Sequence, residues 1–113
     1  MSDFEINKAV ATAWLDCDYD FDDEAETVDL VGYATYLGAY GVGDERLEKY
    51  GEFDPCNNPS DAWPIIIKNE ISIVFMPDEW ECHALINNDE AFNTTNKNPL
   101  RATMIVFLMM SEQ

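Results

Sequence analysis

The residues best suited to do chemistry are asparagines that precede two predicted helix starts, together with nearby cations. They are Asn57, Asn58, Asn96, Asn98, Lys68, Lys97 and Arg101. A helix N-terminus presents free backbone N–H groups and a partial positive charge, so it can hold a phosphate or a carboxylate. Amide side chains both donate and accept hydrogen bonds, which suits a base edge or a ribose. The pattern predicts a site for a small anionic ligand of the nucleotide type.

An aromatic ring near these residues can supply a surface on which a base stacks. Trp63 lies between the two groups of asparagines, and Trp80 follows further along the chain. We therefore assign the predicted ligand site to Asn57, Asn58, Trp63, Lys68, Asn98 and Arg101. The alternative is plain capping chemistry, because helix starts commonly use asparagine. In that alternative both tryptophans belong to the core.

A second candidate surface is the segment 16–29, which holds eight acidic residues and no basic one. Apolar Leu15, Cys17, Tyr19 and Phe21 alternate with Asp16, Asp18, Asp20 and Asp22. This period of two predicts a half-buried strand with one carboxylate face. Such a face can mimic a nucleic acid in the basic groove of a host protein. The alternative is a solvated edge that prevents strand-to-strand aggregation.

Catalytic and metal-binding patterns are weak in this sequence. A calcium loop starting at Asp18 would place Asp23 where the turn needs glycine. His83 is the only histidine, and its neighbour Cys82 would point to the opposite face of a strand. No Gly-rich phosphate loop or HExxH motif occurs. We predict no catalytic residues, no metal site and no cofactor, although the many acids leave carboxylate chemistry open.

The predicted ligand site depends on a short helix that begins near Asn58. Asn58 and Ser60 are both suitable N-caps. Starting at Asn58 puts Pro59 at N1, but it places Pro64 beyond the first turn, where proline removes a backbone hydrogen bond. We therefore predict Ser60 as the cap.

Two further helices are predicted near the ends of the sequence. Ser2 and Glu5 form a capping-box pattern for a helix over 3–13. Asn98 and Pro99 supply the cap and N1 of the last helix. This last helix is apolar nearly all round, which indicates burial on several sides or coverage by a partner subunit.

The predicted strands are all short. One or two strands are expected over 28–40, and a hairpin is expected from 71–76 and 80–86 around the turn 77–79. Polar loops are expected between these elements. The first, over 41–51, can also form a short helix with an i,i+4 pair of Glu45 and Lys49, and the second covers 87–97. This order predicts one small α+β domain over 1–113, an antiparallel sheet with helices packed on one face.

Composition narrows the function further. Among 113 residues, 23 are acidic and 6 basic, a net charge of −17. This charge argues against direct nucleic-acid or membrane binding, because both are polyanionic. No signal-peptide pattern is visible, and the longest apolar run, 104–110, is too short to span a bilayer. We expect a cytoplasmic protein whose three cysteines, Cys17, Cys56 and Cys82, stay free thiols.

Three stretches of the sequence resemble a known family. They are SDFEINK at 2–8, FDPCNNPSDAWPIII at 53–67, and NKNPLRATMIVFLMM at 96–110. Together they resemble the NinX-type proteins of lambdoid phages and prophages, which are small proteins of unknown function. The resemblance implies a phage accessory protein acting in the bacterial cytoplasm, and it implies no known reaction. The acidic segment 16–29 lies outside the three stretches.

Two functions follow as hypotheses. In the first, a non-enzymatic phage protein binds and sequesters a small nucleotide-type anion and so counters a host pathway. In the second, the acidic face of Asp16, Asp18, Asp20 and Asp22 blocks a basic host protein as a nucleic-acid mimic. A homo-oligomer formed through the C-terminal helix is compatible with either hypothesis.

Overall fold

The computed structural model describes residues 1–37, 43–86 and 89–112. Its elements, in order, are α1 (Asp3–Trp14), β1 (Tyr19–Asp22), β2 (Thr27–Leu37), β3 (Gly43–Glu52), α2 (Pro59–Asn69), β4 (Ser72–Met76), β5 (Glu79–Ile86), β6 (Asp89–Asn96) and α3 (Pro99–Ser111). The strands form two antiparallel sheets, β1-β2-β3 and β4-β5-β6. The fold is α+β, as predicted, with its strands divided between two sheets.

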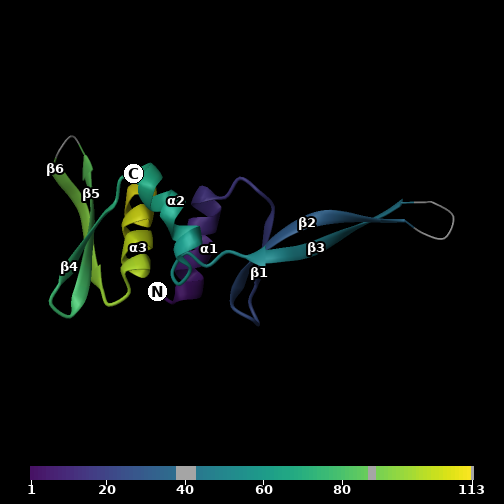
Figure 1. Cartoon of the computed structure of the whole chain (residues 1–113), viewed down its shortest axis with the longest axis horizontal. Helices are drawn as coiled ribbons and strands as arrows, with labels where there is room; N and C mark the ends of the chain where they lie inside the picture. The colour runs from purple at the N-terminus through teal and green to yellow at the C-terminus, as the bar shows by residue number, and fades with distance from the viewer. Residues whose placement is uncertain (38–42, 87–88, 113) are drawn as a thin grey trace.

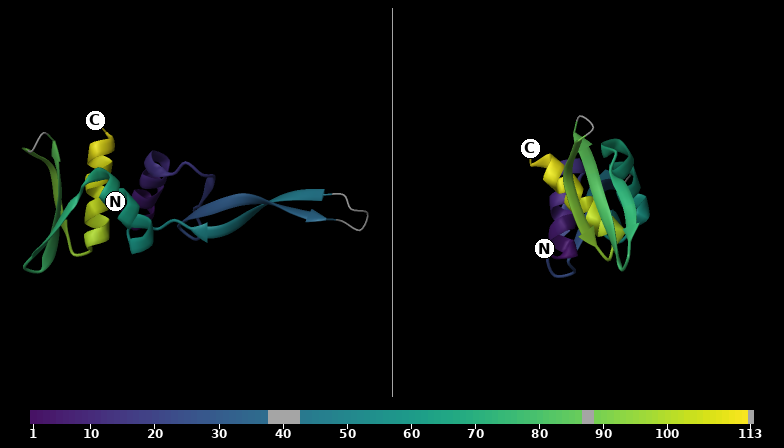
Figure 2. Two further views of the ribbon diagram at one scale, coloured as in Figure 1. Left: turned by 45° about the horizontal axis from the view of Figure 1, so that its top comes forward. Right: turned by 90° about the vertical axis from the view of Figure 1, so that its left-hand side faces the viewer.

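Helix α3 lies at the centre of the folded body. It contacts β5 and β6 on one side and α1 and α2 on the other (Figure 1). Its buried side chains include Ala102, Met104, Val106 and Phe107. The predicted burial of this apolar helix on several sides is thus achieved within one chain. Figure 2 shows the helices on one face of the β4-β5-β6 sheet.

Strands β2 and β3 form an arm that projects from this body (Figures 1 and 2). Strand β1 pairs with β2 from Thr27 to Leu30, whereas β3 follows β2 as far as Leu37. The arm therefore narrows to a two-stranded ribbon beyond Leu30. It lengthens the molecule, which measures 63 Å along its longest axis.

The helix starts follow local sequence signals. Ser2 and Glu5 make the predicted capping box of α1, and Asn98 caps α3 with Pro99 at N1. The prediction of Ser60 as the cap of α2 is wrong, because Asn58 caps this helix and Pro64 lies inside it. Pro64 leaves the carbonyl of Ser60 without an intrahelical donor. Ser60 is exposed, so water can hydrate that carbonyl.

The hairpin prediction is confirmed by β4 and β5, which pair from Met76 and Glu79 outward. Both polar-loop predictions are wrong. The segment 43–52 is strand β3, and 89–96 is strand β6, while 38–42 and 87–88 lie outside the described residues. Each segment pairs with a neighbouring strand, β2 or β5, and that pairing outweighs its own weak preference for strand.

Two smaller predictions also need correction. Glu45 and Lys49 do not form a helical pair, because both lie in β3. The predicted strand over 15–22 is limited to Tyr19–Asp22, so Asp16 and Asp18 precede β1. Among the described helices, none is long and apolar enough to cross a membrane.

Candidate functional site

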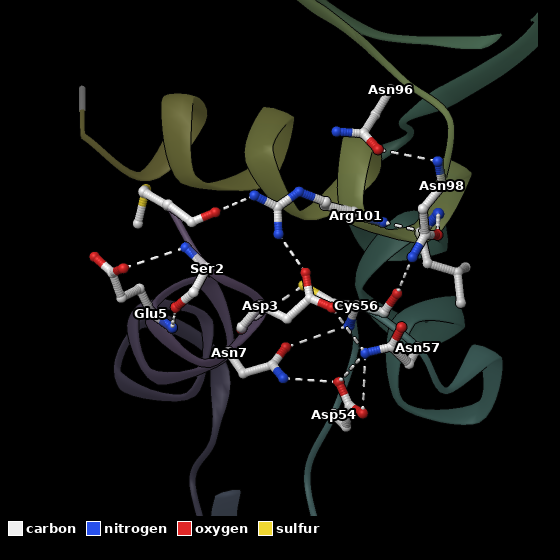
Figure 3. Close-up of polar contacts among 12 residues, drawn as sticks. Ser2, Asp3, Glu5, Asn7, Asp54, Cys56, Asn57, Asn96, Asn98 and Arg101 are labelled. Carbon is white, nitrogen blue, oxygen red and sulfur yellow. Dashed lines mark hydrogen bonds and ion pairs between the residues drawn. The ribbon is translucent and has the colours of Figure 1, made fainter. Parts of the chain in front are cut away.

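Several of the predicted asparagines meet where three segments converge (Figure 3). These segments are the start of α1, the loop 53–58 and the start of α3. The loop is held by its own turn, in which the backbone N–H groups of Asn57 and Asn58 donate to the carbonyl of Asp54 at 3.1 and 2.7 Å. We call this set of contacts the asparagine network.

Asn7 is buried, and its partner Asp54 is half-buried. The amide nitrogen of Asn7 donates to Asp54 Oδ1 at 2.7 Å. The amide oxygen of Asn7 accepts from the backbone N–H of Cys56 at 3.2 Å. Asn7 is only 6% exposed, so both ends of its amide are used for holding the loop against α1.

Arg101 and Asn57 both contact Asp3, at the start of α1. The Arg101 guanidinium forms an ion pair with Asp3 and also donates to the carbonyl of Met1. Asn57 Nδ2 donates to Asp3 Oδ2 at 3.1 Å and to Asp54 Oδ1 at 3.1 Å. The donors of both predicted ligand residues thus face carboxylates of the chain itself.

Asn98 joins the network to α3. Its side-chain oxygen accepts from the N–H groups of Leu100 and Arg101 at 3.0 and 3.3 Å. Its side-chain nitrogen donates to the carbonyl of Cys56 at 2.7 Å. This one residue therefore caps a helix and fixes the loop 53–58.

The remaining predicted ligand residues lie on α2, outside these contacts. Asn58 Oδ1 accepts from the N–H of Ser60 at 3.0 Å as the helix cap. Trp63 is 58% exposed and so is not a core residue. Lys68 is exposed in the last turn. The fold brings Asn57, Asn98 and Arg101 into one network, and Trp63 and Lys68 take no part in its hydrogen bonds.

A cavity of about 270 Å³ lies beside the network. Its carboxylates come from three parts of the chain, namely Asp3, Glu26, Glu52 and Asp54. Asn57 is the predicted ligand residue that lines it, next to Phe4 and Phe53. Carboxylates are negative at neutral pH, so the cavity disfavours an anion and suits a cation or a neutral polar group.

The acidic segment contributes to one face of the β1-β2-β3 sheet. Asp20 lies opposite Asp29, and Asp29 lies opposite Glu52, so three carboxylates form a row across the strands. Like charges placed directly opposite one another repel. Lys49 relieves this repulsion at Asp29 (3.2 Å) and Glu52 (2.8 Å).

Asp29 and Asp22 also have local structural roles. A hydrogen bond from Thr27 at 2.7 Å, with Lys49 nearby, holds the pKa of Asp29 below its usual value. Asp22 Oδ1 accepts from the N–H groups of Glu24 and Ala25, closing the turn after β1. Asp16, Asp18 and Asp20 are exposed. Among the described residues, no group of acid, cysteine and histidine side chains converges as metal ligands.

The three cysteines are free thiols, as predicted, in two different environments. Burial, with the carboxylates of Asp3 and Asp54 nearby, raises the pKa of Cys56 to about 12. Burial and Glu81 raise the pKa of Cys82 to about 11. These shifts make both thiols poor nucleophiles at neutral pH, because the thiolate is the reactive form.

This difference predicts the pattern of thiol labelling. With iodoacetamide at neutral pH, the exposed Cys17 should be alkylated first, and Cys56 and Cys82 should react only after unfolding. Peptide mass spectrometry of the native and urea-unfolded protein measures this directly. Rapid native labelling of Cys56 would contradict the packing of the loop 53–58 against α1.

Sequence analysis missed the acceptors of the network, Asp3, Asn7 and Asp54. All three lie in stretches already noted for other reasons, 2–8 and 53–67. Asn7 follows Ile6 on the buried side of α1, and a polar residue on a buried helix side needs a partner. That was the available signal, and it would have indicated a structural amide at this position.

Comparison with known proteins gives the family. A family model described as "Bacteriophage P22, NinX" matches residues 1–111. No curated protein and no solved structure gives a significant match. The matched residues include the acidic segment 16–29 and every residue of the asparagine network, from Asp3 to Arg101. The chain belongs to the NinX family of phage proteins.

Proposed function

We propose that this phage protein is a non-enzymatic binder of a basic partner protein, acting in the cytoplasm of the infected bacterium. The partner would dock on the acidic surface of Asp16, Asp18, Asp20 and Asp22, of which the first two precede β1 and the last two lie on it. The single observation that carries the proposal is the concentration of eight acids and no base in 16–29. Carboxylates on this exposed surface would attract a basic groove and speed association at low salt.

The contacts of the asparagine network favour this function over capture of a small anion. Asn57, Asn98 and Arg101 already donate to Asp3, Asp54 and the carbonyl of Cys56. An anion at that position would have to displace a carboxylate of the chain. The lining of the adjoining cavity has four carboxylates and no basic side chain among the described residues. Sequestration of a nucleotide-type ligand therefore stays the second hypothesis.

A matched pair of charge variants tests the proposal. The first variant changes the face, Asp16→Asn, Asp18→Asn, Asp20→Asn and Asp22→Asn; asparagine at 22 keeps the oxygen that closes the turn. The control removes the same number of charges at exposed acids elsewhere, Glu70→Gln, Asp78→Asn, Glu79→Gln and Glu112→Gln. The probe is a fluorescent oligolysine peptide, whose affinity is measured by anisotropy across a salt series.

The face variant should bind the peptide at least about tenfold more weakly than the control, because each exposed charge pair contributes up to about 1 kcal/mol. Binding by the unchanged protein should weaken steeply with salt. Equal losses in both variants would contradict a localised face and leave net charge as the cause. A rise in melting temperature with nucleotides that Arg101→Ala removes would instead support the second hypothesis.

A further inference from the structure

The projecting arm exposes an apolar face that the proposed function does not use. Tyr33 lies opposite Leu47, and Leu37 lies further along β2 with the same side-chain direction, because strand residues two apart share a face. Tyr33, Leu37 and Leu47 are 70%, 77% and 50% exposed. By the strand register, Thr35, Glu45 and Lys49 lie on the same face. We call the surface of Val31, Tyr33, Leu37 and Leu47 the Tyr33 face.

The opposite face of the arm carries Tyr36 and Tyr50, and Tyr36 is held in polar contacts. The guanidinium of Arg46 lies 5.0 Å from the centre of the Tyr36 ring. The Tyr36 hydroxyl donates to Glu48, and Arg46 forms an ion pair with Asp44 at 3.0 Å. These contacts give the Tyr36 ring and hydroxyl polar partners within the arm. Tyr50, which is 65% exposed, packs beside Gly32 on this face. Both exposed leucines of the arm lie on the Tyr33 face, which is therefore the face better suited to an apolar contact.

The distribution of charge along the chain indicates which partner can cover the Tyr33 face. The arm over 31–49 carries three acids and two bases in sequence, whereas the rest of the chain carries twenty acids and four bases. The arm is therefore nearly neutral on a strongly acidic protein. A basic partner is drawn to the acidic body rather than to the arm, and a nucleic acid is repelled by the whole molecule. A second copy of this chain meets the least repulsion where the arms meet.

We propose that the Tyr33 face forms the contact between two copies of the protein. Two identical faces pair about a twofold axis, so Tyr33 and Leu47 of one copy pack on the same residues of the other. Because the arm projects from one end of each body (Figure 1), antiparallel pairing of the arms keeps the two acidic bodies apart. The contact also covers apolar side chains of a ribbon that is weakly stable on its own.

The area of the face sets the strength of this dimer. Two strands about 4.8 Å apart, with seven residues rising about 3.3 Å each, cover on the order of 200 Å² in projection. Specific interfaces cover about 800 Å² on each partner. The arm contact is therefore a reversible dimer that forms with rising protein concentration. Salt should strengthen it, because salt screens the repulsion between two acidic copies.

Sedimentation equilibrium over a roughly hundredfold concentration range tests the dimer on the full chain. The variant Tyr33→Thr with Leu47→Thr removes the apolar surface and keeps good strand formers. Its control is Val74→Thr with Phe75→Thr, at exposed positions of β4. We expect the unchanged protein and the control to form a dimer that tightens with salt, and the arm variant to dimerise at least about tenfold more weakly.

Hydrogen exchange of the unchanged protein gives a second readout that needs no variant. Amides of 31–37 and 43–49 should gain protection with concentration, and those of β4 should not. A protein that stays monomeric at every concentration and salt overturns the proposal. So does a dimer that is weakened by Met109→Gln on α3 and unaffected by the arm variant. Salt should weaken the binding of oligolysine and strengthen the dimer. The proposed function and the proposed dimer can therefore fail independently of each other.

Discussion

Replacing Phe107 by alanine is expected to lower the free energy of unfolding by about 3–5 kcal/mol. Phe107 is 5% exposed, and its ring meets Trp14 edge-on with centroids 6.1 Å apart. Helix α3 lies between a sheet on one side and two helices on the other, so neither layer can close the cavity without losing its own contacts. Small domains are stable by only about 5–15 kcal/mol, so this loss is a large share.

Urea unfolding followed by circular dichroism measures the effect. The control is Phe75→Ala, the same change at a side chain that is 67% exposed. It should cost under about 1 kcal/mol, because little surface is removed from the core. Similar losses for both variants would contradict the central place of α3. A change in the slope with urea would indicate a change in the denatured state instead.

The elements that were predictable from sequence depend on short-range signals. The capping box of Ser2 and Glu5, the Asn98-Pro99 start and the turn after Met76 each use residues a few positions apart. Such signals satisfy backbone groups locally, so they act in nearly any tertiary context. The apolar character of α3 likewise indicated a buried helix before any neighbour was known.

The elements that were not predictable depend on distant partners. The segment 43–52 is rich in Glu, Lys and Arg, which favour helices, but β2 supplies a complete antiparallel partner for it. The segment 89–96 likewise pairs with β5 along the chain. Pro64 disfavours a start at Asn58 by local preference, but the helix is exposed at Ser60 and Pro64, so water can replace the lost hydrogen bond. In each case tertiary context or solvent outweighed local preference.

The candidate site shows the same division. Asn98 was correctly predicted as the cap of the last helix, whereas Asn58 caps α2 in place of the predicted Ser60. Sequence could not show that acceptors from residues 3, 7 and 54 would meet these donors across the fold. Donors facing a ligand and donors facing the chain itself look identical in a sequence.

Replacing Asn7 by alanine is expected to lower the free energy of unfolding by about 2–4 kcal/mol. The change leaves the N–H of Cys56 buried without its acceptor and removes one donor from Asp54. The control is Asn57→Ala, which also removes a donor from Asp54, but at an exposed residue where water replaces it. This control should cost about 1 kcal/mol or less.

Thermal and urea unfolding of the two variants separate the structural role from a ligand-binding role. Loss of stability in Asn7→Ala should be accompanied by native labelling of Cys56, because the loop 53–58 would lose its anchor on α1. If Asn7→Ala is as stable as Asn57→Ala, the buried amide does not hold the loop. The network would then have little structural role, and the case for an external ligand at Asn57, Asn98 and Arg101 would strengthen. The expected difference of about 1–3 kcal/mol between the two variants would instead show that the network stabilises the fold.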